Sequence, residues 1–327
     1  IIETSSLRAA DLVRQLLAFS RGTQPEDLQV VYLNRIIRET IRLLQSSMGK
    51  DVQLELDLSS DLPPIAANST QVQQALINHC EAERYRFAVL DCQGPNRDTV
   101  ADVLALRQRY DTRYAALYYP WLTVPEPRPV NVTDIRQLAI PPSGHVVGIY
   151  ARVDNTRGVH KAPANEVIRG ITGLTRKINQ REHDVLNPVG IDALRDFRDS
   201  NRGLRVWGAR CITSDSDWKY VNVRRLLIFI EASIDRGLQW AVFEPNAEPL
   251  WARVRRAITN FLTVVWRNGA LEGTSVEQAF FVKCDRTTMT QTDIDNGRLI
   301  CVIGVAPVKP AEFVIIRIGL WTADAEQ

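Results

Sequence analysis

Three histidines and two carboxylates are the residues whose types first suggest chemistry. His145, His160 and His183 could exchange protons with Glu166 and Asp184 near neutral pH, as general acid–base catalysis requires. No serine or cysteine nucleophile motif accompanies them. We therefore interpret the histidines as packed or solvated residues. We expect no catalytic residue in this chain, and we predict that it is not an enzyme.

A second candidate for chemistry is the stretch RGVHKAPAN at residues 157–165, which resembles a phosphate-binding loop in its glycine and lysine. It lacks the GxxxxGK[ST] spacing that aims successive backbone N–H groups at a phosphate. We interpret it as a structural loop, and we expect no cofactor.

The cysteines show no metal-binding or redox pattern. There are five, and no two of them form a CxxC pair: Cys80, Cys92, Cys211, Cys284 and Cys301. The four histidines do not cluster at ligand spacing either. We predict reduced cysteines in the core and no metal site.

The net charge of the chain is too small to attract it to a polyanion as a whole. The 327 residues are 45% hydrophobic and 24% charged, and 40 basic residues nearly balance 38 acidic ones. This composition is typical of a globular chain with two or three cores. The longest apolar runs, 226–230 and 299–305, are far shorter than the roughly 20 residues of a membrane span. No secretory signal is visible at the N-terminus.

One basic stretch could contact nucleic acid because its arginines lie beside tryptophans. It comprises Arg253, Arg255, Arg256 and Arg267 beside Trp251 and Trp266. Glu248 and Glu272 lie nearby in the sequence, and the whole chain has little net charge. We therefore favour a helix face that contacts another subunit or solvent, and we predict neither a nucleic-acid nor a membrane partner.

The hydrophobic pattern changes character near residue 79. Before it, the periodicity predicts helices at 7–21, 33–45 and 70–78 and a strand at 52–58. After it, we expect strands at 87–91, 114–119 and 130–138, a helix at 103–110, and a further helix that starts at Ser143. Long helices at 222–236 and 249–268 precede strands at 279–284, 299–305 and 312–318. The pattern predicts an α+β fold, a mixed sheet with flanking helices, preceded by a helix and a partial α/β segment.

The first segment, residues 1–78, resembles a sensor histidine kinase. The stretch RAADLVRQLLAFSR at 8–21 is similar to the second dimerisation helix, and the following residues are similar to the start of the ATP-binding domain. The family's phosphoacceptor histidine precedes that helix, and no histidine stands in residues 1–78. Ala82 and Glu83 occupy the place of the Asn–Ala pair that helps hold magnesium, and the glycine-rich lid motifs are absent. We expect an incomplete fragment without phosphoryl transfer.

Residues 79–327 resemble a different family. Seven stretches in order are similar to the C-terminal region of phage-type contractile tail sheath proteins over about residues 79–319: YAALYYPW at 114–121, PPSGHVVGIYAR at 141–152, GVHKAPAN at 158–165, VWGAR at 206–210, YVNVRRL at 220–226, WAVFEPN at 240–246 and GVAPVKPAEF at 304–313. We therefore expect two segments, a kinase-like fragment at 1–78 and a sheath-like domain at 79–327.

The sheath resemblance implies a structural subunit of a contractile phage tail or phage tail-like injection particle. Its partners would be copies of itself in helically stacked hexameric rings, an inner tube, and baseplate and terminator proteins. Such subunits are linked by exchanged terminal strands, and the matching strand implies subunit contacts at Phe313, Val314, Ile315, Ile316, Arg317 and Ile318. The resemblance implies assembly in the cytoplasm and a final place in a virion or released particle.

Two alternatives stay open at this point. A degenerate kinase would bind nucleotide through its first segment, and a sheath decoy would bind normal subunits and stop their growth.

Overall fold

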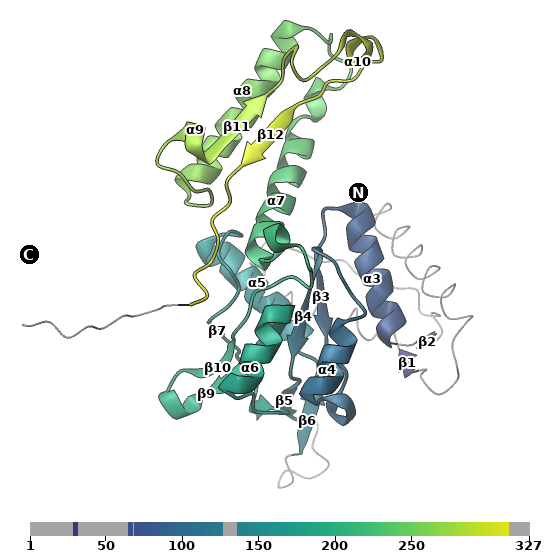
Figure 1. Ribbon diagram of the computed structural model, residues 1–327, viewed down its shortest axis with the longest axis vertical. Helices are drawn as coiled ribbons and strands as arrows, with labels where there is room; N and C mark the ends of the chain where they lie inside the picture. Colours follow the sequence, from purple (N-terminus) through teal and green to yellow (C-terminus); the bar gives the residue numbers. More distant parts are fainter. Residues whose placement is uncertain (1–28, 32–64, 68, 127–135, 314–327) are drawn as a thin grey trace, which may run out of the picture.

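The computed structural model describes residues 29–31, 65–67, 69–126 and 136–313, which form a broad α/β body and a narrower projection (Figure 1). The body holds the main sheet and its helices, and the projection holds two long helices with a two-stranded sheet. The predicted α+β class, with a mixed sheet and flanking helices, is confirmed. Among the described residues, none of the helices has the length and apolar character needed to cross a membrane.

The main sheet has five strands in the order β3-β4-β9-β10-β7. Its first three strands are parallel, and the last three are joined by antiparallel pairs. The bounds are β3 Ala88–Asp91, β4 Ala115–Tyr119, β9 Ile191–Phe197, β10 Gly203–Val206 and β7 Glu166–Val167. The strands predicted at 87–91 and 114–119 are therefore confirmed.

Strand β4 is central because both of its faces are covered. All five of its residues are buried, and Leu117, Tyr118 and Tyr119 have no exposed surface. Leu117 and Tyr119 belong to one apolar cluster, and Tyr118 belongs to another on the opposite face. A strand buried on both faces carries a continuous apolar run, which explains why this segment was recognisable in the sequence.

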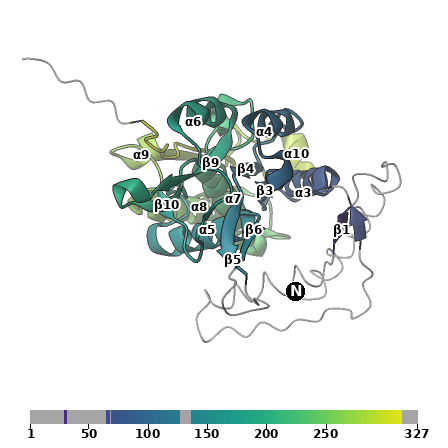
Figure 2. The ribbon, with the colours of Figure 1, turned by 90° about the horizontal axis from the view of Figure 1, so that it is seen from below.

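Helices cover the two faces of the sheet separately. On one face lie α3 (Ser69–Glu83), α4 (Val100–Arg107) and α6 (Gln180–Leu186), and on the other lies α5 (Ser143–Arg157). Figure 2 shows α3, α4 and α6 on one side of the strands and α5 on the other. The helix expected to start at Ser143 does so, and the helix predicted at 70–78 extends to Glu83.

A second, three-stranded sheet lies below the main sheet in Figure 1, with the order β6-β5-β8. Its strands are antiparallel: β5 (Leu122–Pro125) pairs with β6 (Gln137–Ile140) and with β8 (Gly173–Leu174). The strand predicted at 130–138 is thus observed from Gln137, and its residues 130–135 lie outside the described part.

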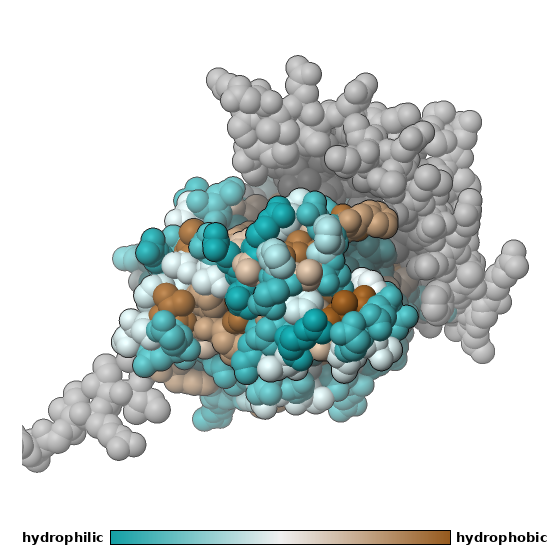
Figure 3. Space-filling model, turned by 90° about the horizontal axis from the view of Figure 1, so that it is seen from above, coloured by the Kyte–Doolittle hydropathy of each residue, from teal (hydrophilic) through white to brown (hydrophobic). Residues whose placement is uncertain are grey.

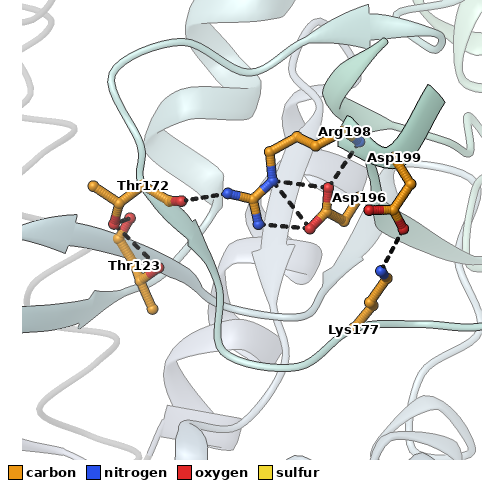
Figure 4. Close-up of polar contacts among 6 residues, drawn as sticks. All are labelled: Thr123, Thr172, Lys177, Asp196, Arg198 and Asp199. Carbon is orange, nitrogen blue, oxygen red and sulfur yellow. Dashed lines mark hydrogen bonds and ion pairs between the residues drawn. The ribbon is translucent and has the colours of Figure 1, made fainter. Parts of the chain in front are cut away.

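Polar contacts tie the two sheets together (Figure 4). Arg198 Nη2 lies 2.6 Å from Asp196 Oδ2, and Arg198 Nη1 donates to the Thr172 carbonyl oxygen at 3.0 Å. The Thr172 hydroxyl in turn donates to the Thr123 carbonyl oxygen at 2.9 Å. Hydrogen bonds from Arg198 hold the pKa of Asp196 below its usual value. Because Thr123 lies in β5 and Asp196 in β9, these contacts hold the small sheet against the main one.

The projection consists of α7 (Val221–Gly237), α8 (Glu248–Arg267), α9 (Val276–Ala279), β11 (Phe280–Lys283), α10 (Gln291–Asp295) and β12 (Val302–Val305). Leu250, Val254, Ile258 and Leu262 form a buried stripe along α8 at four-residue spacing. This stripe packs with residues of α7, β11 and β12 in a third apolar cluster. Both long helices predicted from the sequence are confirmed.

The remaining predictions concern segments at the two ends. A short antiparallel pair joins β1 (Gln29–Val31) to β2 (Ile65–Ala67). The predicted helices at 7–21 and 33–45 and the strand at 52–58 lie outside the described residues. In the predicted strand at 312–318, Glu312 and Phe313 are not in a strand, and residues 314–318 lie outside the described part.

Gly190 is required where the chain enters β9. Its φ is 82°, in the left-handed region, and a Cβ there would lie 2.5 Å from the Cys211 carbonyl oxygen. Gly170 has a similar φ of 76° with no atom within 4 Å of its Cβ position. Comparing substitutions at the two glycines therefore separates the cost of backbone strain from the cost of steric overlap.

We predict that Gly190→Ala destabilises the chain more than Gly170→Ala. Gly170→Ala should cost about 1 kcal/mol because of its positive φ alone, and Gly190→Ala should cost about 2 kcal/mol more because backbone atoms must move. Chemical denaturation of both variants checks this difference. Equal losses of unfolding free energy would contradict the close approach at Cys211.

Candidate assembly site

The strands β11 and β12 form a two-stranded antiparallel sheet on the projection (Figure 1). Phe281 pairs with Gly304 and Lys283 with Val302, and the Ala306 N–H donates to the Ala279 carbonyl oxygen at 2.9 Å. Antiparallel ladders alternate between hydrogen-bonded and non-hydrogen-bonded pairs. Starting from the Ala306 bond, this alternation directs the backbone groups of Val282 and Ile303 away from the partner strand.

Both edges of this sheet are therefore open within the described part of the chain. No third described strand pairs with β11 or with β12. Unpaired N–H and C=O groups on such edges are a template for another strand. The sheet can accept one strand at the Val282 edge and one at the Ile303 edge.

The two faces of the sheet differ. Phe280 and Ile303 face the apolar cluster around α8. On the opposite face, Phe281 is 49% exposed, and its ring covers Gly304, where an added Cβ would lie 2.1 Å from the ring. One face is thus anchored to a helix, which keeps the short sheet in place while its edges stay free.

Figure 3 shows the end of the molecule that carries α10. In that view apolar residues form small separate patches among hydrophilic ones. This end therefore offers no large continuous apolar surface in the visible described part.

After β12 the chain returns to the body through residues 306–313, which we call the exit segment. The Val308 N–H donates to the Ala270 carbonyl oxygen at 3.2 Å. Asn222, 2% exposed at the start of α7, donates from Nδ2 to the carbonyl oxygens of Val308 at 3.1 Å and His160 at 2.9 Å. One buried amide thus joins the exit segment, α7 and the loop at 157–165.

Glu312 fastens the end of the exit segment to the body. Arg210 Nε donates to Glu312 Oε1 at 2.8 Å and Arg210 Nη2 to Oε2 at 2.5 Å, so the pair is bidentate. The Tyr220 hydroxyl donates to Oε2 at 3.3 Å, and Lys219 Nζ lies 3.7 Å from the same oxygen. The side chain of Arg210 is 8% exposed and that of Glu312 16%, so water screens this pair weakly. We call these four residues the Glu312 clamp.

The charges around Glu312 determine its ionisation. Burial alone would raise the pKa of Glu312, but the hydrogen bonds and charge of Arg210, with the charge of Lys219 and the Tyr220 hydroxyl, outweigh it and lower that pKa. Glu312 is therefore ionised at neutral pH. A lowered pKa in the folded state means that the clamp stabilises the fold at neutral pH and loses this contribution as pH falls through the lowered pKa.

Of the six subunit-contact residues predicted from the sequence, the structure describes Phe313. Its side chain is 69% exposed and follows directly after the clamp. The other predicted contacts, Val314, Ile315, Ile316, Arg317 and Ile318, lie outside the described residues. Their role in contacts stays a prediction.

The structure brings only some of the candidate histidines together. His160 and His183 line a cavity of about 730 Å³ beside the exit segment, with Glu312 and Lys161 among the other lining residues, whereas His145 is not among them. Burial, followed by the charge of Arg195, lowers the pKa of His183, which favours a neutral imidazole. Among the residues that the structure describes, no Ser, Thr or Cys lines this cavity. The described residues also contain no group of three His, Cys, Asp or Glu side chains that could hold a metal ion.

The basic stretch on α8 is partly engaged within the chain. Trp251 is 1% exposed in the core, so it cannot stack on a base. The Arg253 guanidinium lies over the Trp240 ring and 3.5 Å from Glu244. Arg255 donates to the Cys284 carbonyl oxygen at 3.1 Å. Part of this stretch therefore packs within the chain, and its contact with another subunit or solvent stays a prediction.

Sequence reasoning did not identify Arg210, Asn222 or Glu312 as partners. Arg210 and Glu312 are 102 positions apart, and each is an ordinary charged residue in its own segment. Asn222 stands at the start of a helix, where a polar residue is expected for capping alone. Without an alignment of related chains, nothing local signals that these residues meet.

The fold agrees with solved structures of contractile particles. The chain is 31% identical to a chain of an extracellular contractile injection system, the PVC sheath complex in its contracted state, and covers 88% of that chain with 93% of its own length at a TM-score of 0.69. It is 38% identical to a chain of the anti-feeding prophage helical sheath in its contracted state, with 78% and 66% covered and a TM-score of 0.65. An α/β body with this projection is therefore the architecture of a sheath protein.

Family models give the same assignment at the level of sequence. The phage tail sheath protein central domain matches residues 62–212, and the phage tail sheath C-terminal domain matches residues 213–320. The chain belongs to the phage tail sheath family. The match includes the central domain and begins at residue 62, inside the segment that resembled a kinase.

Similar proteins of known identity support the family assignment and show how much of a sheath protein this chain covers. Over 257 residues the chain is 27% identical to a prophage major tail sheath protein of Pseudomonas aeruginosa strain UCBPP-PA14, covering 76% of this chain and 62% of that one. It is also 40% identical over 77 residues to the sensor kinase CckA of Brucella abortus strain 2308, covering 24% of this chain and 8% of the kinase. The chain spans less than two thirds of the length of the sheath relative.

We predict that Glu312→Gln destabilises the chain by about 2 to 4 kcal/mol at neutral pH. The substitution leaves the buried Arg210 guanidinium without its charged partner. The exposed Glu272 provides the matched control, and Glu272→Gln should cost less than about 0.5 kcal/mol. Denaturation at neutral and acid pH checks both values, because acid should weaken the wild type more than Glu312→Gln. Equal stability of the two variants would contradict the clamp.

Proposed function

We propose that this chain is a structural subunit of the sheath of a contractile phage tail or phage tail-like injection particle. It assembles with copies of itself into hexameric rings stacked helically around an inner tube, and it acts by contraction. The observation that carries the proposal is the two-stranded sheet, whose two edges pair with no other described strand, next to a clamped exit segment that leads into an apolar stretch of sequence.

Strand addition would join neighbouring subunits. The stretch that begins at Phe313 and continues through Val314, Ile315, Ile316, Arg317 and Ile318 pairs with an open edge of β11–β12 in a neighbouring copy. Each added strand satisfies backbone groups that face away from the ladder at Val282 or Ile303. Because donor and acceptor are different surfaces of one chain, the contact is heterologous and continues as a helix.

The Glu312 clamp fixes the point at which the linking strand leaves its own subunit. Residues up to Glu312 move with their own body, and the following residues move with the neighbour's sheet. Bodies can then rotate relative to each other during contraction while every backbone pair in the shared sheet is kept. A strand held at one end by its own subunit and at the other by its neighbour supports large rearrangement without dissociation.

The family resemblance also supports partners beyond the sheath itself. A chain of the anti-feeding prophage baseplate structure is 37% identical to this one, with a TM-score of 0.67, and it covers 77% of this chain. We include a baseplate, an inner tube and a terminator among the partners. Assembly takes place in the cytoplasm, and the finished sheath belongs to a virion or released particle.

A second candidate function is a cap on sheath growth. The match to a sensor kinase over 77 residues favours it. We assign that match to residues 1–78, a dimerisation helix and an incomplete ATP-binding domain in front of a sheath domain at 79–327. A subunit that donates its C-terminal strand but carries kinase-like sequence in front of its sheath domain would join a growing sheath and stop it.

We predict that Ile303→Pro abolishes subunit association and leaves the fold intact. Proline removes the N–H that faces the open edge, and edge positions tolerate proline because the ladder does not use that N–H. Ile303→Ala is the matched control, since it shortens the side chain and keeps the N–H. Sedimentation velocity and circular dichroism of both variants and of the wild type check association and folding.

Three outcomes are informative for this comparison. A folded monomer for Ile303→Pro beside an assembling Ile303→Ala supports strand addition at this edge. Equal assembly of both variants would exclude the Ile303 edge as an acceptor. A wild type that stays monomeric would count against the sheath proposal itself.

A further inference from the structure

Cys284 directly follows β11, and Cys301 directly precedes β12. The two cysteines therefore flank the segment 285–300 at the tip of the projection. The ladder ends with the pair of Lys283 and Val302, and Cys284 and Cys301 are the next residues beyond it. Both side chains belong to the third apolar cluster, and each thiol affects the pKa of the other. Both cysteines are free in this structure.

The register places these residues at the kind of position where a crosslink fits. Counting from the Ala306 to Ala279 bond, the pairs formed by Phe280 and Val305 and by Val282 and Ile303 are non-hydrogen-bonded. Continuing the same alternation one step past the ladder makes Cys284 and Cys301 the next position of this kind. Such pairs bring Cα atoms to about 4.5 Å and their side chains close together. Disulfides span Cα distances of about 4.4 to 6.8 Å, so no large backbone movement is needed.

We propose that Cys284 and Cys301 form a redox site, in which oxidation joins β11 to β12 by a cross-strand disulfide. The oxidant class is a small-molecule disulfide. The Cys301 thiolate attacks it, releases one thiolate and carries a mixed disulfide. The Cys284 thiolate then attacks the Cys301 sulfur and releases the second thiolate. The two cysteines are oxidised, and one small-molecule disulfide is reduced to two thiols.

Access and acidity determine the rate of this step. Cys284 is fully buried, whereas Cys301 is partly exposed, so an external oxidant reaches Cys301 first. Burial, with the neighbouring Cys284, raises the pKa of Cys301 to about 12, and burial also raises the pKa of Cys284. The charge of Arg255 acts in the opposite direction on both. Since thiolates are the reacting species, oxidation is slow at neutral pH and accelerates as pH rises.

The disulfide would close the segment from 285 to 300, which carries α10. That segment is already ordered by local contacts: the Thr290 hydroxyl accepts from the Asp293 N–H at 3.2 Å, and the Arg298 N–H donates to the Asp293 carbonyl oxygen at 2.8 Å. Closing it fixes the register of β11 on β12 and restrains the tip in the unfolded chain. The crosslink therefore stabilises the sheet whose edges face outward.

One consequence rests on the proposed function, although the crosslink itself does not. A subunit assembled in a reducing cytoplasm would carry two thiols, and a released particle would meet an oxidising environment. Failure of assembly would leave the crosslink prediction intact, and failure of the crosslink would leave the sheath proposal intact.

The test uses the full native chain and oxidised glutathione over a range of pH. After acid quenching, the protein is unfolded in an alkylating reagent and digested with trypsin without reduction. We expect residues 284–286 joined to residues 299–317, because trypsin does not cut between Lys309 and Pro310. Cys80, Cys92 and Cys211 should be alkylated. Alkylated Cys284 and Cys301, a mixed disulfide without the crosslink, or a crosslink to another cysteine would each overturn the proposal.

A second readout uses variants. The unfolding temperature of the wild type should be higher after oxidation than in a reducing buffer. Cys301→Ser should lose this difference, and the control Cys80→Ser should keep it. A difference that persists in Cys301→Ser would overturn the proposal, and peptide mapping of the wild type decides the matter if Cys301→Ser does not fold.

Discussion

The bidentate pair between Arg210 and Glu312 connects the end of the central domain to the end of the C-terminal domain. Arg210 belongs to the last residues of the central-domain match, and Glu312 lies near the end of the C-terminal match. The same arginine donates from Nη1 to the Asn187 carbonyl oxygen at 2.9 Å, so the pair reaches into the body beside the main sheet. Together with the contacts of Asn222 to Val308 and of Tyr220 and Lys219 to Glu312, the pair fixes where the chain leaves the body at Phe313.

The fixed exit of the chain at Phe313 explains why the body and the projection have different roles. The body buries β4 on both faces and is rigid, because dense packing leaves few alternative arrangements. The projection rests one face of a short sheet on α8 and leaves its edges unpaired within the described residues. In our account, rigid bodies supply shape, and shared sheets supply links. Contraction then changes how bodies pack while the links persist.

Much of the fold could be predicted from the sequence because its elements have strong patterns. The apolar face from Val254 to Val265 predicted α8, and the apolar run that ends at Tyr119 predicted β4. The candidate site could be predicted only as a C-terminal strand. Arg210 and Glu312 meet across 102 positions, and open strand edges are properties of pairing rather than of composition. A single sequence carries no local signal for either feature.

Electron microscopy of the purified full chain, alone and mixed with normal sheath subunits and their inner tube, tests the central claim most directly. The account predicts rings or striated tubes in which this chain is incorporated along the length. Incorporation restricted to one end of short tubes would identify a cap instead of a working subunit. A persistent monomer in every mixture would contradict the claim that this chain assembles as a sheath protein.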